Sequence, residues 1–289
     1  MVRPMPHPAL APGNTAVITG GASGIGLAAA LRFAAMGLRV AIADLGADRL
    51  GAAREAVLAA GAPDVVAMEV DVADAGALSG LASTVTARFG GTDLLMLNAG
   101  IGPDSTITGP REVWERILAV NLWGVINGTQ AFLPGMLDRG YPGLIVCTGS
   151  KQGITTPPGN PAYNVSKAGV KVFTEALEHD LRNRHNPLIS AHLLIPGFVF
   201  TGLTQGERRE KPAAAWTPEQ TVEFMLHSLE RGDFYILCPD NDVPRGLDAQ
   251  RILWAAGDIV ENRPPLSRWH PAHAEAFKAV VAKGLGRGE

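Results

Sequence analysis

Residues 15–26 read TAVITGGASGIG and combine three local features of one kind of α/β fold. Thr15–Thr19 is apolar and β-branched, as in a buried strand, and apolar residues at helical spacing continue from Gly24 to Met36. A glycine-rich turn joins the two. This order lets a pyrophosphate approach main-chain N–H groups at the start of the helix. The stretch therefore predicts a dinucleotide site, although such a turn can also be only a tight connection between strand and helix.

Short β-branched runs alternate with longer helical patterns, which is typical of βαβ units and a parallel sheet. Strands are expected at Thr15–Thr19, Arg39–Ala43, Val65–Val70, Leu94–Leu97, Leu144–Thr148, Ile189–Ile195 and Phe234–Cys238. Helices are expected at Gly24–Met36, Asp48–Ala60, Asp74–Phe89, Pro110–Leu137 (one long helix that can bend), Asn160–Arg184, from Pro218 onward, Leu247–Ala256 and Ala272–Lys283. The helix from Pro218 has Thr217 as its expected N-cap and Pro218 as its first residue. Continuous apolar strands indicate a sheet covered on both faces. The pattern predicts a doubly wound parallel sheet of about seven strands.

Composition excludes several classes of function. The 289 residues are 46% hydrophobic with a net charge of −3, and no run of Lys and Arg suggests nucleic acid. No apolar run of about 18 residues suggests a membrane span, and the proline-rich start, Met1–Gly13, lacks the apolar segment of a signal peptide. Two cysteines, Cys147 and Cys238, fit a reducing cytoplasm, where we expect the protein.

Three polar side chains have the composition of an acid–base site. Tyr163 and Lys167 are four apart in a predicted helix and therefore share one face. An ammonium within about 4 Å would lower the phenol pKa from about 10 towards the working pH. Ser150 ends a predicted strand and could hold a substrate oxygen against the phenol. The trio suits proton transfer to a carbonyl or from an alcohol, although the Tyr–Lys spacing alone also fits an ordinary helix-surface pair.

Two aspartates follow predicted strands. Asp44 can accept both ribose hydroxyls of NAD and would repel the 2′-phosphate of NADP. Neither Leu45 nor Ser23 is basic, so NAD(H) is favoured over NADP(H). Asp71, before Val72, could reach the adenine amino group. Both aspartates could instead cap the helices that follow.

Six motifs follow one another along the chain: the glycine turn, Asn98-Ala99-Gly100, Asn121, Ser150, Tyr163-x-x-x-Lys167 and Pro196-Gly197. In this order they resemble the motifs of the short-chain dehydrogenase/reductase family over about residues 14–201. This resemblance implies a single Rossmann-like domain over residues 1–289 and hydride transfer between a nicotinamide and a CH–OH or C=O group. It also implies a homotetramer or homodimer.

The resemblance implies a role for each matching position. Ser150 would position the substrate oxygen, Tyr163 would act as acid in reduction and base in oxidation, and Lys167 would bind the nicotinamide ribose and lower the phenol pKa. Asn121 would hold a water beside Lys167, although an amide there could also only kink or cap a helix. The other expected cofactor contacts are Gly20, Ser23, Gly24, Ile25, Gly26, Asp44, Leu45, Asp71, Val72, Asn98, Ala99, Gly100, Pro196, Gly197, Val199 and Thr201.

The substrate region is expected between Ile101-Gly102, residues 152–160 and residues 198–216. Its apolar side chains favour a hydrophobic ketone or secondary alcohol, with substrate contacts from Ser150, Gln152, Tyr163 and Phe198. We expect residues 202–232 to form a substrate loop whose first half, Gly202–Trp216, is a candidate lid.

Two features depart from the family pattern. Lys151 beside the serine could favour an anionic substrate, but the interpretation preferred here is that it faces solvent. The C-terminal extension, residues 240–289, could cover the pocket or, as preferred here, dock on a neighbouring subunit. His270 and His273 have no third ligand nearby, so no metal site is expected.

The main hypothesis is an NAD(H)-dependent oxidoreductase of a ketone or secondary alcohol. One alternative is a non-catalytic dinucleotide sensor or scaffold on the same fold, against which the complete set of catalytic residues argues. A second is an epimerase or dehydratase of the extended family. The three-residue gap between Gly20 and Gly24 and the short substrate region argue against that reading.

Overall fold

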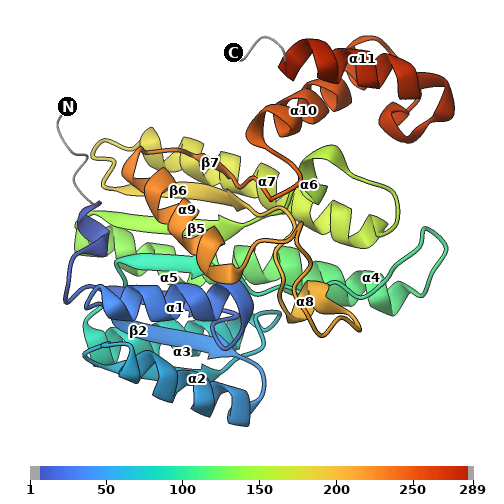
Figure 1. Cartoon of the computed structure of the whole chain (residues 1–289). Coiled ribbons are helices and arrows are strands. Elements are labelled where there is room, and N and C mark those ends of the chain that lie inside the picture. The colour runs from blue at the N-terminus through green and yellow to red at the C-terminus, as the bar shows by residue number, and fades with distance from the viewer. Residues whose placement is uncertain (1–6, 286–289) are drawn as a thin grey trace.

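Seven parallel strands form one sheet in the computed structural model, which describes residues 7–285 (Figure 1). The strands are β1 (Thr15–Thr19), β2 (Arg39–Asp44), β3 (Val65–Glu69), β4 (Leu94–Leu97), β5 (Gly143–Thr148), β6 (Ile189–Ile195) and β7 (Tyr235–Leu237). Their order in the sheet is β3-β2-β1-β4-β5-β6-β7. The predicted doubly wound sheet is confirmed, and each predicted strand differs from the observed one by at most one residue at either end.

Helices cover both faces of this sheet. They are α1 (Gly24–Ala35), α2 (Ala47–Ala59), α3 (Ala75–Phe89), α4 (Arg111–Leu118), α5 (Gly124–Arg139), α6 (Gln152–Thr155), α7 (Pro161–Arg182), α8 (Gly202–Gln205), α9 (Pro218–Glu230), α10 (Arg245–Val260) and α11 (Ala274–Leu285). Short 3-10 turns lie at η1 (Pro8–Leu10), η3 (Ser267–Trp269) and η4 (Pro271–His273), and η2 (Ala119–Trp123) is a π-helical segment.

Successive strand residues point to opposite faces, and two buried clusters follow from this. Ile18 faces α1, α2 and α9 in the first cluster. Its neighbour Val17 faces α3, α5 and α7 in the second. All five residues of β1 are buried, which explains why the strand has no polar face.

The strand order reverses between β1 and β4, because β2 and β3 lie on one side of β1 and β4 to β7 on the other. In an open parallel sheet, ligands bind at the carboxyl ends of the strands on either side of such a reversal. The glycine turn follows β1 and Asn98 follows β4, so both predicted motifs lie at this point.

The expected helix Pro110–Leu137 is one continuous helical stretch interrupted by a π-helical turn. α4 runs into η2, and η2 runs into α5. Asn121 is the middle residue of η2, where the extra residue in the turn bends the helix.

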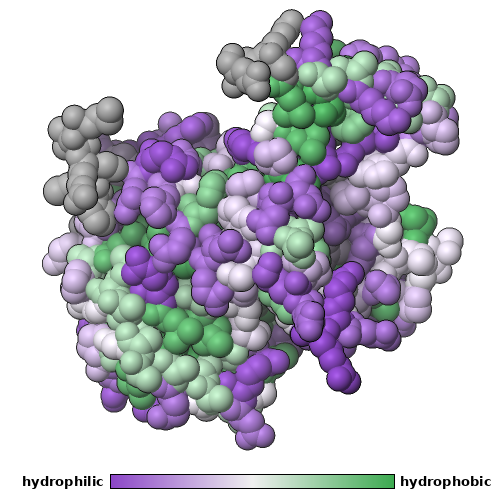
Figure 2. All heavy atoms as spheres, in the orientation of Figure 1, coloured by the Kyte–Doolittle hydropathy of each residue, from purple (hydrophilic) through white to green (hydrophobic). Residues whose placement is uncertain are grey.

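The C-terminal extension forms two helices that stand clear of the α/β body (Figure 1). α10 contacts α6, whereas α11 contacts α10 and the short turns η3 and η4. Trp254 of α10 donates from Nε1 to the Ser267 hydroxyl over 2.8 Å, and the Arg263 guanidinium lies 4.0 Å from the centre of the Trp254 ring. α11 has no buried residue, and apolar surface is visible on these helices in Figure 2.

The expected substrate loop, residues 202–232, divides into two different parts. Residues 218–230 are α9, which begins with the predicted cap at Thr217 and buries Val222, Met225 and Leu229 beside α1. The first half is anchored at its end, because Ala215 is buried and Trp216 packs against the core beside Phe224 of α9. The candidate lid therefore lies within residues 202–214.

Candidate active site

The glycine turn places β1 and α1 in direct contact. A side chain at Gly26 would collide with the Gly20 carbonyl oxygen, and one at Gly20 would lie 2.8 Å from Ala99 Cα. Gly24 has a φ of +52°, a backbone conformation that favours glycine. Ser23 is the N-cap of α1 but makes no side-chain hydrogen bond there. The first N–H groups of α1, which include Ile25, are therefore free of a side-chain cap, as anion binding at a helix start requires.

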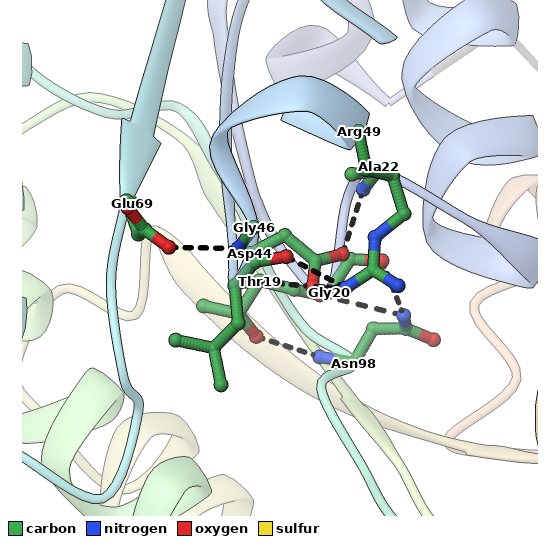
Figure 3. Close-up of polar contacts among 9 residues, drawn as sticks. Thr19, Gly20, Ala22, Asp44, Gly46, Arg49, Glu69 and Asn98 are labelled. Atoms are coloured by element: carbon green, nitrogen blue, oxygen red, sulfur yellow. Dashed lines mark hydrogen bonds and ion pairs between the residues drawn. The ribbon is translucent and has the colours of Figure 1, made fainter. Parts of the chain in front are cut away.

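Asp44 lies at the end of β2 and is tied to the glycine turn (Figure 3). Its Oδ2 accepts a hydrogen bond from Ala22 N over 3.0 Å, and its Oδ1 accepts one from Leu45 N over 2.8 Å. Arg49, in the first turns of α2, forms an ion pair with Oδ1 at 3.0 Å. Asp44 does not provide a side-chain cap for α2, whose N-cap is Gly46. The sequence interpretation considered only Leu45 and Ser23 as possible bases and missed Arg49.

Asp71 and Val72 follow β3 but differ in exposure. Asp71 is exposed and accepts a hydrogen bond from Ala73 N, whereas the cap of α3 is Asp74. Val72 is buried, and Asn127 of α5 donates to its carbonyl oxygen over 3.2 Å. Asp71 is thus available to a ligand at the carboxyl edge, and Val72 contributes packing.

Asn98 connects the ends of the central strands (Figure 3). Its Nδ2 donates to the carbonyl oxygens of Thr19 and Gly20, and the N–H groups of Asn98 and Ala99 both donate to the Thr19 hydroxyl. These bonds hold the ends of β1 and β4 together. Gly100 is exposed, and a side chain there would lie 3.6 Å from Lys167 Nζ.

Ser150, Tyr163 and Lys167 lie together beyond the end of β5. Burial raises the pKa of Tyr163, while the Ser150 hydroxyl, as its hydrogen-bond partner, lowers it by less. Lys167 is 4% exposed, its Nζ donates to the Thr148 carbonyl oxygen over 2.8 Å, and burial lowers its pKa to about 8. Its Nζ lies 5.8 Å from the centre of the Tyr163 ring.

The expected lowering of the Tyr163 pKa by Lys167 is not found. The pKa of Tyr163 is raised because burial disfavours the phenolate, and the Lys167 ammonium donates its hydrogen bond to the Thr148 carbonyl oxygen. The prediction of an already acidic tyrosine is therefore wrong.

Asn121 is fully buried at the π-helical turn and clamps the loop after β4. Its Oδ1 accepts a hydrogen bond from Ile101 N over 2.8 Å, and its Nδ2 donates to Ile101 O and to the Ser166 hydroxyl. Both ends of the amide are thus used by protein groups. The Asn121 side chain thereby positions residues 100–101 beside Lys167.

The segment after β6 faces the glycine turn. A side chain at Gly24 would lie 3.2 Å from Thr201 Cγ2, so Thr201 closes the space above the turn. Val199 forms an isolated bridge with Trp216, and the Thr204 hydroxyl donates to the Val199 carbonyl oxygen. A side chain at Gly102 would lie 3.1 Å from Leu203 and 3.6 Å from the Tyr163 ring, which places Leu203 near the phenol.

Two further substrate candidates lie near the same segments. Phe198 is half-buried, with the Arg208 guanidinium 5.8 Å from its ring centre. Gln152 begins α6, a one-turn helix inside the expected loop 152–160, and its N–H donates to the Ser150 hydroxyl over 3.2 Å.

Lys151 does not face solvent, so the preferred interpretation of this residue is wrong. Its side chain is only 15% exposed and is paired with Asp240 and Asp248. Because its charge is neutralised inside the protein, it is also not a free cation for an anionic substrate.

Comparison with known proteins agrees with this geometry. The family model for short chain dehydrogenases matches residues 14–212. This chain belongs to the short-chain dehydrogenase/reductase family. Membership, together with relatives that are dehydrogenases, places the protein among the oxidoreductases of CH–OH groups.

Several members of the short-chain dehydrogenase/reductase family are similar over most of this chain. The 1-deoxy-11-beta-hydroxypentalenate dehydrogenase of Streptomyces avermitilis is 33% identical, over 83% of this chain and 90% of its own. A family member from Burkholderia phymatum, solved in complex with NAD, has a TM-score of 0.78 and 29% identity, covering 88% of this chain and 96% of its own. An alcohol dehydrogenase from Thermococcus sibiricus, solved with 5-hydroxy-NADP, has a TM-score of 0.68 and 27% identity, covering 75% and 90%.

The residues of this short-chain dehydrogenase/reductase fit a nicotinamide dinucleotide. Glycines leave the backbone of the turn bare, the start of α1 has no side-chain cap, and a carboxylate stands at the end of β2. Backbone N–H groups would hold the pyrophosphate, and Asp44 would receive the adenine ribose.

Outside this site, the described part of the chain offers a cavity but no metal cluster. Residues 7–285 contain no cluster of three or more His, Cys, Asp or Glu side chains that could hold a metal ion, and no helix among them is long and apolar enough to cross a membrane. A cavity of about 170 Å³ lies at the opposite edge of the sheet, near the starts of β5 and β6, between Met136, Tyr141, Leu181 and Ile189. None of the predicted site residues lines that cavity.

Proposed function

We propose that this protein is an NAD(H)-dependent oxidoreductase that interconverts a hydrophobic ketone and its secondary alcohol. The observation that carries the proposal is the placement of Ser150, Tyr163 and Lys167 beside the glycine turn, at the strand-order reversal. Two polar hydroxyls and a buried ammonium at this edge form a site for one oxygen atom and one proton.

Each residue of this trio has a distinct role in the proposed reaction. When bound, the nicotinamide ring supplies the hydride for reduction and accepts it in oxidation. Ser150 donates a hydrogen bond to the substrate oxygen and orients it. Tyr163 gives its phenolic proton to that oxygen in reduction and takes the proton back in oxidation. Lys167, while protonated, stabilises the phenolate that forms when the proton leaves.

The raised pKa of Tyr163 has a consequence for this mechanism. A neutral phenol is ready to donate a proton, so reduction needs no prior ionisation. Oxidation needs the phenolate, and the pKa of about 8 at Lys167 means that its positive charge is present at and below neutral pH. We propose that Asn121 contributes by holding residues 100–101 next to Lys167.

Asp44 supports NAD(H) over NADP(H), since its carboxylate repels a phosphate. Arg49 offsets part of that repulsion, so we propose a preference and not an exclusion. Asp71 would reach the adenine, and Pro196, Gly197, Val199 and Thr201 would line the nicotinamide side. Residues 202–214 would close over the substrate, whose contacts would be Ser150, Gln152, Tyr163 and Phe198.

We further propose a homodimer or homotetramer in a reducing cytoplasm. Large apolar side chains are exposed on the helices that flank β5, namely Trp123, Val165 and Val172 at 54%, 50% and 62%. The C-terminal helices add Leu253, Ile259 and Val260, which are 64%, 85% and 84% exposed. Exposed patches of this kind mark protein contacts. Cys147 and Cys238 are free thiols.

The test is spectrophotometric. Purified protein is mixed with NAD or NADP and a panel of aliphatic, cyclic and aromatic secondary alcohols, and reduced cofactor is followed by absorbance. Turnover with NAD, faster than with NADP and abolished in Tyr163→Phe, is the expected result. Tight NADH binding without turnover on the whole panel, or on the corresponding ketones, would favour a dinucleotide sensor instead.

A further inference from the structure

A buried cluster of charges joins the catalytic loop to the C-terminal helices. Lys151 Nζ lies 2.6 Å from Asp248 Oδ2 and 3.2 Å from Asp240 Oδ2, and the two carboxylates are 5% and 8% exposed. Asp240 follows β7, and Asp248 lies in the first turn of α10. Arg251, one turn further along α10, lies 3.9 Å from the other oxygen of Asp248. Arg268 also interacts electrostatically with Arg251 and Asp248. The two buried carboxylates thus have cationic partners on every side.

This cluster packs directly on the segment that lines the nicotinamide side. Asp240 Oδ2 accepts a hydrogen bond from Phe198 N over 3.3 Å. A side chain at Gly197 would lie 2.5 Å from that same oxygen and 2.9 Å from Lys151 Nζ. Lys151 N donates to the Pro196 carbonyl oxygen over 3.3 Å. The residue after Ser150 is therefore fixed both through its main chain and through its ammonium.

The one-turn helix α6 extends the connection to Lys167. A side chain at Gly153 would lie 2.5 Å from the Lys167 carbonyl oxygen, so α6 rests on the backbone of α7 at the catalytic lysine. On its other side, α6 contacts α10, and Thr155 of α6 lines one small cavity together with Arg251 and Trp254 of α10. α6 is thus enclosed between α7 and α10.

We propose that Lys151 is a positioning residue for Ser150, held by Asp240 and Asp248, so that the C-terminal helices set the geometry of the active site in their own chain. A buried ammonium cannot leave two carboxylates without exposing uncompensated charge. Its Cα is therefore held in place, and with it the preceding serine and α6. The kinetic part of this inference rests on the proposed function of Ser150, whereas the structural link does not.

Hydrogen exchange tests the link without cofactor or substrate. In the native chain, residues 153–156 donate main-chain hydrogen bonds to Ser150, Lys151 and Gln152. Asp248→Asn removes one charge of the cluster with little change in shape. Peptides covering residues 149–156 should then exchange about 10-fold faster. Unchanged exchange in these peptides would overturn the proposal, whether or not the protein turns over an alcohol.

A matched control is Asp258→Asn. Asp258 is also a poorly exposed acid of α10, but it pairs with Arg263 and Ser267 within the C-terminal helices. We expect this variant to accelerate exchange in residues 258–270 and to leave residues 149–156 unchanged. Equal acceleration of residues 149–156 by both variants would mean general loosening of the extension and would also overturn the proposal.

A double-mutant cycle separates positioning from lost stability. Asp248→Asn should lower kcat about 10-fold in the wild-type background but less than about 2-fold when Ser150 is already Ala, because the serine to be positioned is gone. NADH affinity should stay within about 2-fold. An equal fall in both backgrounds would refute a role through Ser150. Should Asp248→Asn not fold, the double variant Lys151→Gln/Asp248→Asn removes one charge of each sign and leaves the net charge of the cluster unchanged. It is expected to give the same faster exchange in residues 149–156.

Discussion

Arg49 lies with its Nη2 3.0 Å from Asp44 Oδ1, so the carboxylate expected to receive the adenine ribose already has a cationic partner. The pair is formed at the surface, since the Arg49 side chain is 54% exposed. A guanidinium at this place can also attract a 2′-phosphate. We therefore expect the choice between NAD and NADP to depend on two opposed charges and not on Asp44 alone.

Changing either charge should move the cofactor preference in a predictable direction. Asp44→Ala should narrow the NAD-over-NADP ratio of kcat/KM by about 10-fold or more, and Arg49→Ala should widen it by about 5-fold, as expected for one charge near a phosphate in water. Arg54→Ala is the control, because Arg54 is on the same helix and pairs with Glu55. Wild-type preference for NADP would contradict the assigned role of Asp44.

Tyr163→Phe removes only the hydroxyl that donates the proton. We expect turnover to fall by about 10²–10⁴-fold while NADH binding, followed by fluorescence titration, is nearly unchanged. Because phenylalanine keeps the aromatic ring at this half-buried position, the thermal unfolding midpoint should stay close to that of the wild type. Activity near the wild-type level would refute proton transfer by this residue.

The buried charge of Lys167 should make the wild-type protein less stable at neutral pH than a variant with an uncharged side chain at position 167. The unfolded lysine has a pKa of 10.5 and the folded one about 8, so between these values the unfolded chain binds more protons and rising pH favours folding. Below about pH 8 the cost of burying the charge is fully present. Lys167→Met should therefore raise the free energy of unfolding at pH 7 by about 1–2 kcal/mol, a net value that allows for the lost hydrogen bond to Thr148. Activity should be lost.

Denaturant unfolding at several pH values checks this expectation. The stability difference between Lys167→Met and the wild type should shrink as pH rises from about 8 to about 10.5. Lys171→Met is the control, because Lys171 pairs with Glu175 nearer the surface of the same helix. A pH-independent difference at position 167 would show that the lysine is not buried with its charge.

Two helical glycines, Gly26 of α1 and Gly51 of α2, should show opposite changes in stability when replaced by alanine. Gly26→Ala would drive a methyl group into the Gly20 carbonyl oxygen, so we expect a loss of about 2 kcal/mol or more in stability and at least a 10-fold loss of NADH affinity. Gly51, inside α2, has no atom within 4 Å of a new methyl group. Gly51→Ala should stabilise by about 0.5–1 kcal/mol and leave NADH affinity unchanged.

Thermal unfolding and NADH titration of the two variants distinguish these outcomes. Normal NADH affinity in a folded Gly26→Ala protein would mean that the turn does not approach the dinucleotide.

Local patterns were sufficient for the sheet and for the position of the glycine turn. The buried strands are continuous apolar runs, and Thr217-Pro218 predicted the start of α9. Both features depend only on residues that are neighbours in the sequence. The pair of Arg49 with Asp44 could also have been predicted from the sequence, since a side chain in the first turns of a helix can reach the end of the preceding strand.

Long-range partners were not readable in this way. Nothing near Lys151 in the sequence indicates that its carboxylates come from Asp240 and Asp248, roughly ninety residues later, and a lysine beside a serine most often faces water. The prediction that the pKa of Tyr163 is lowered was wrong for a related reason. The spacing places Lys167 on the correct face, but burial and the bond to Thr148 depend on the assembled strands.

The candidate lid has a consequence for how this scaffold diversifies. Phe200 N donates to Trp216 O and Trp216 N donates to Phe198 O, both over 2.9 Å, so the chain enters and leaves the loop through one closed neck. Residues 206–212 lie beyond this neck and outside the bonds of Thr204 to Val199 and of Asn241 to Ala213 and Ala214. Insertions, deletions or exchange of residues 206–212 can then be absorbed without displacing the nicotinamide side or α9. Evolution, and equally a library built in the laboratory, can rewrite what the enzyme accepts while leaving its chemistry in place.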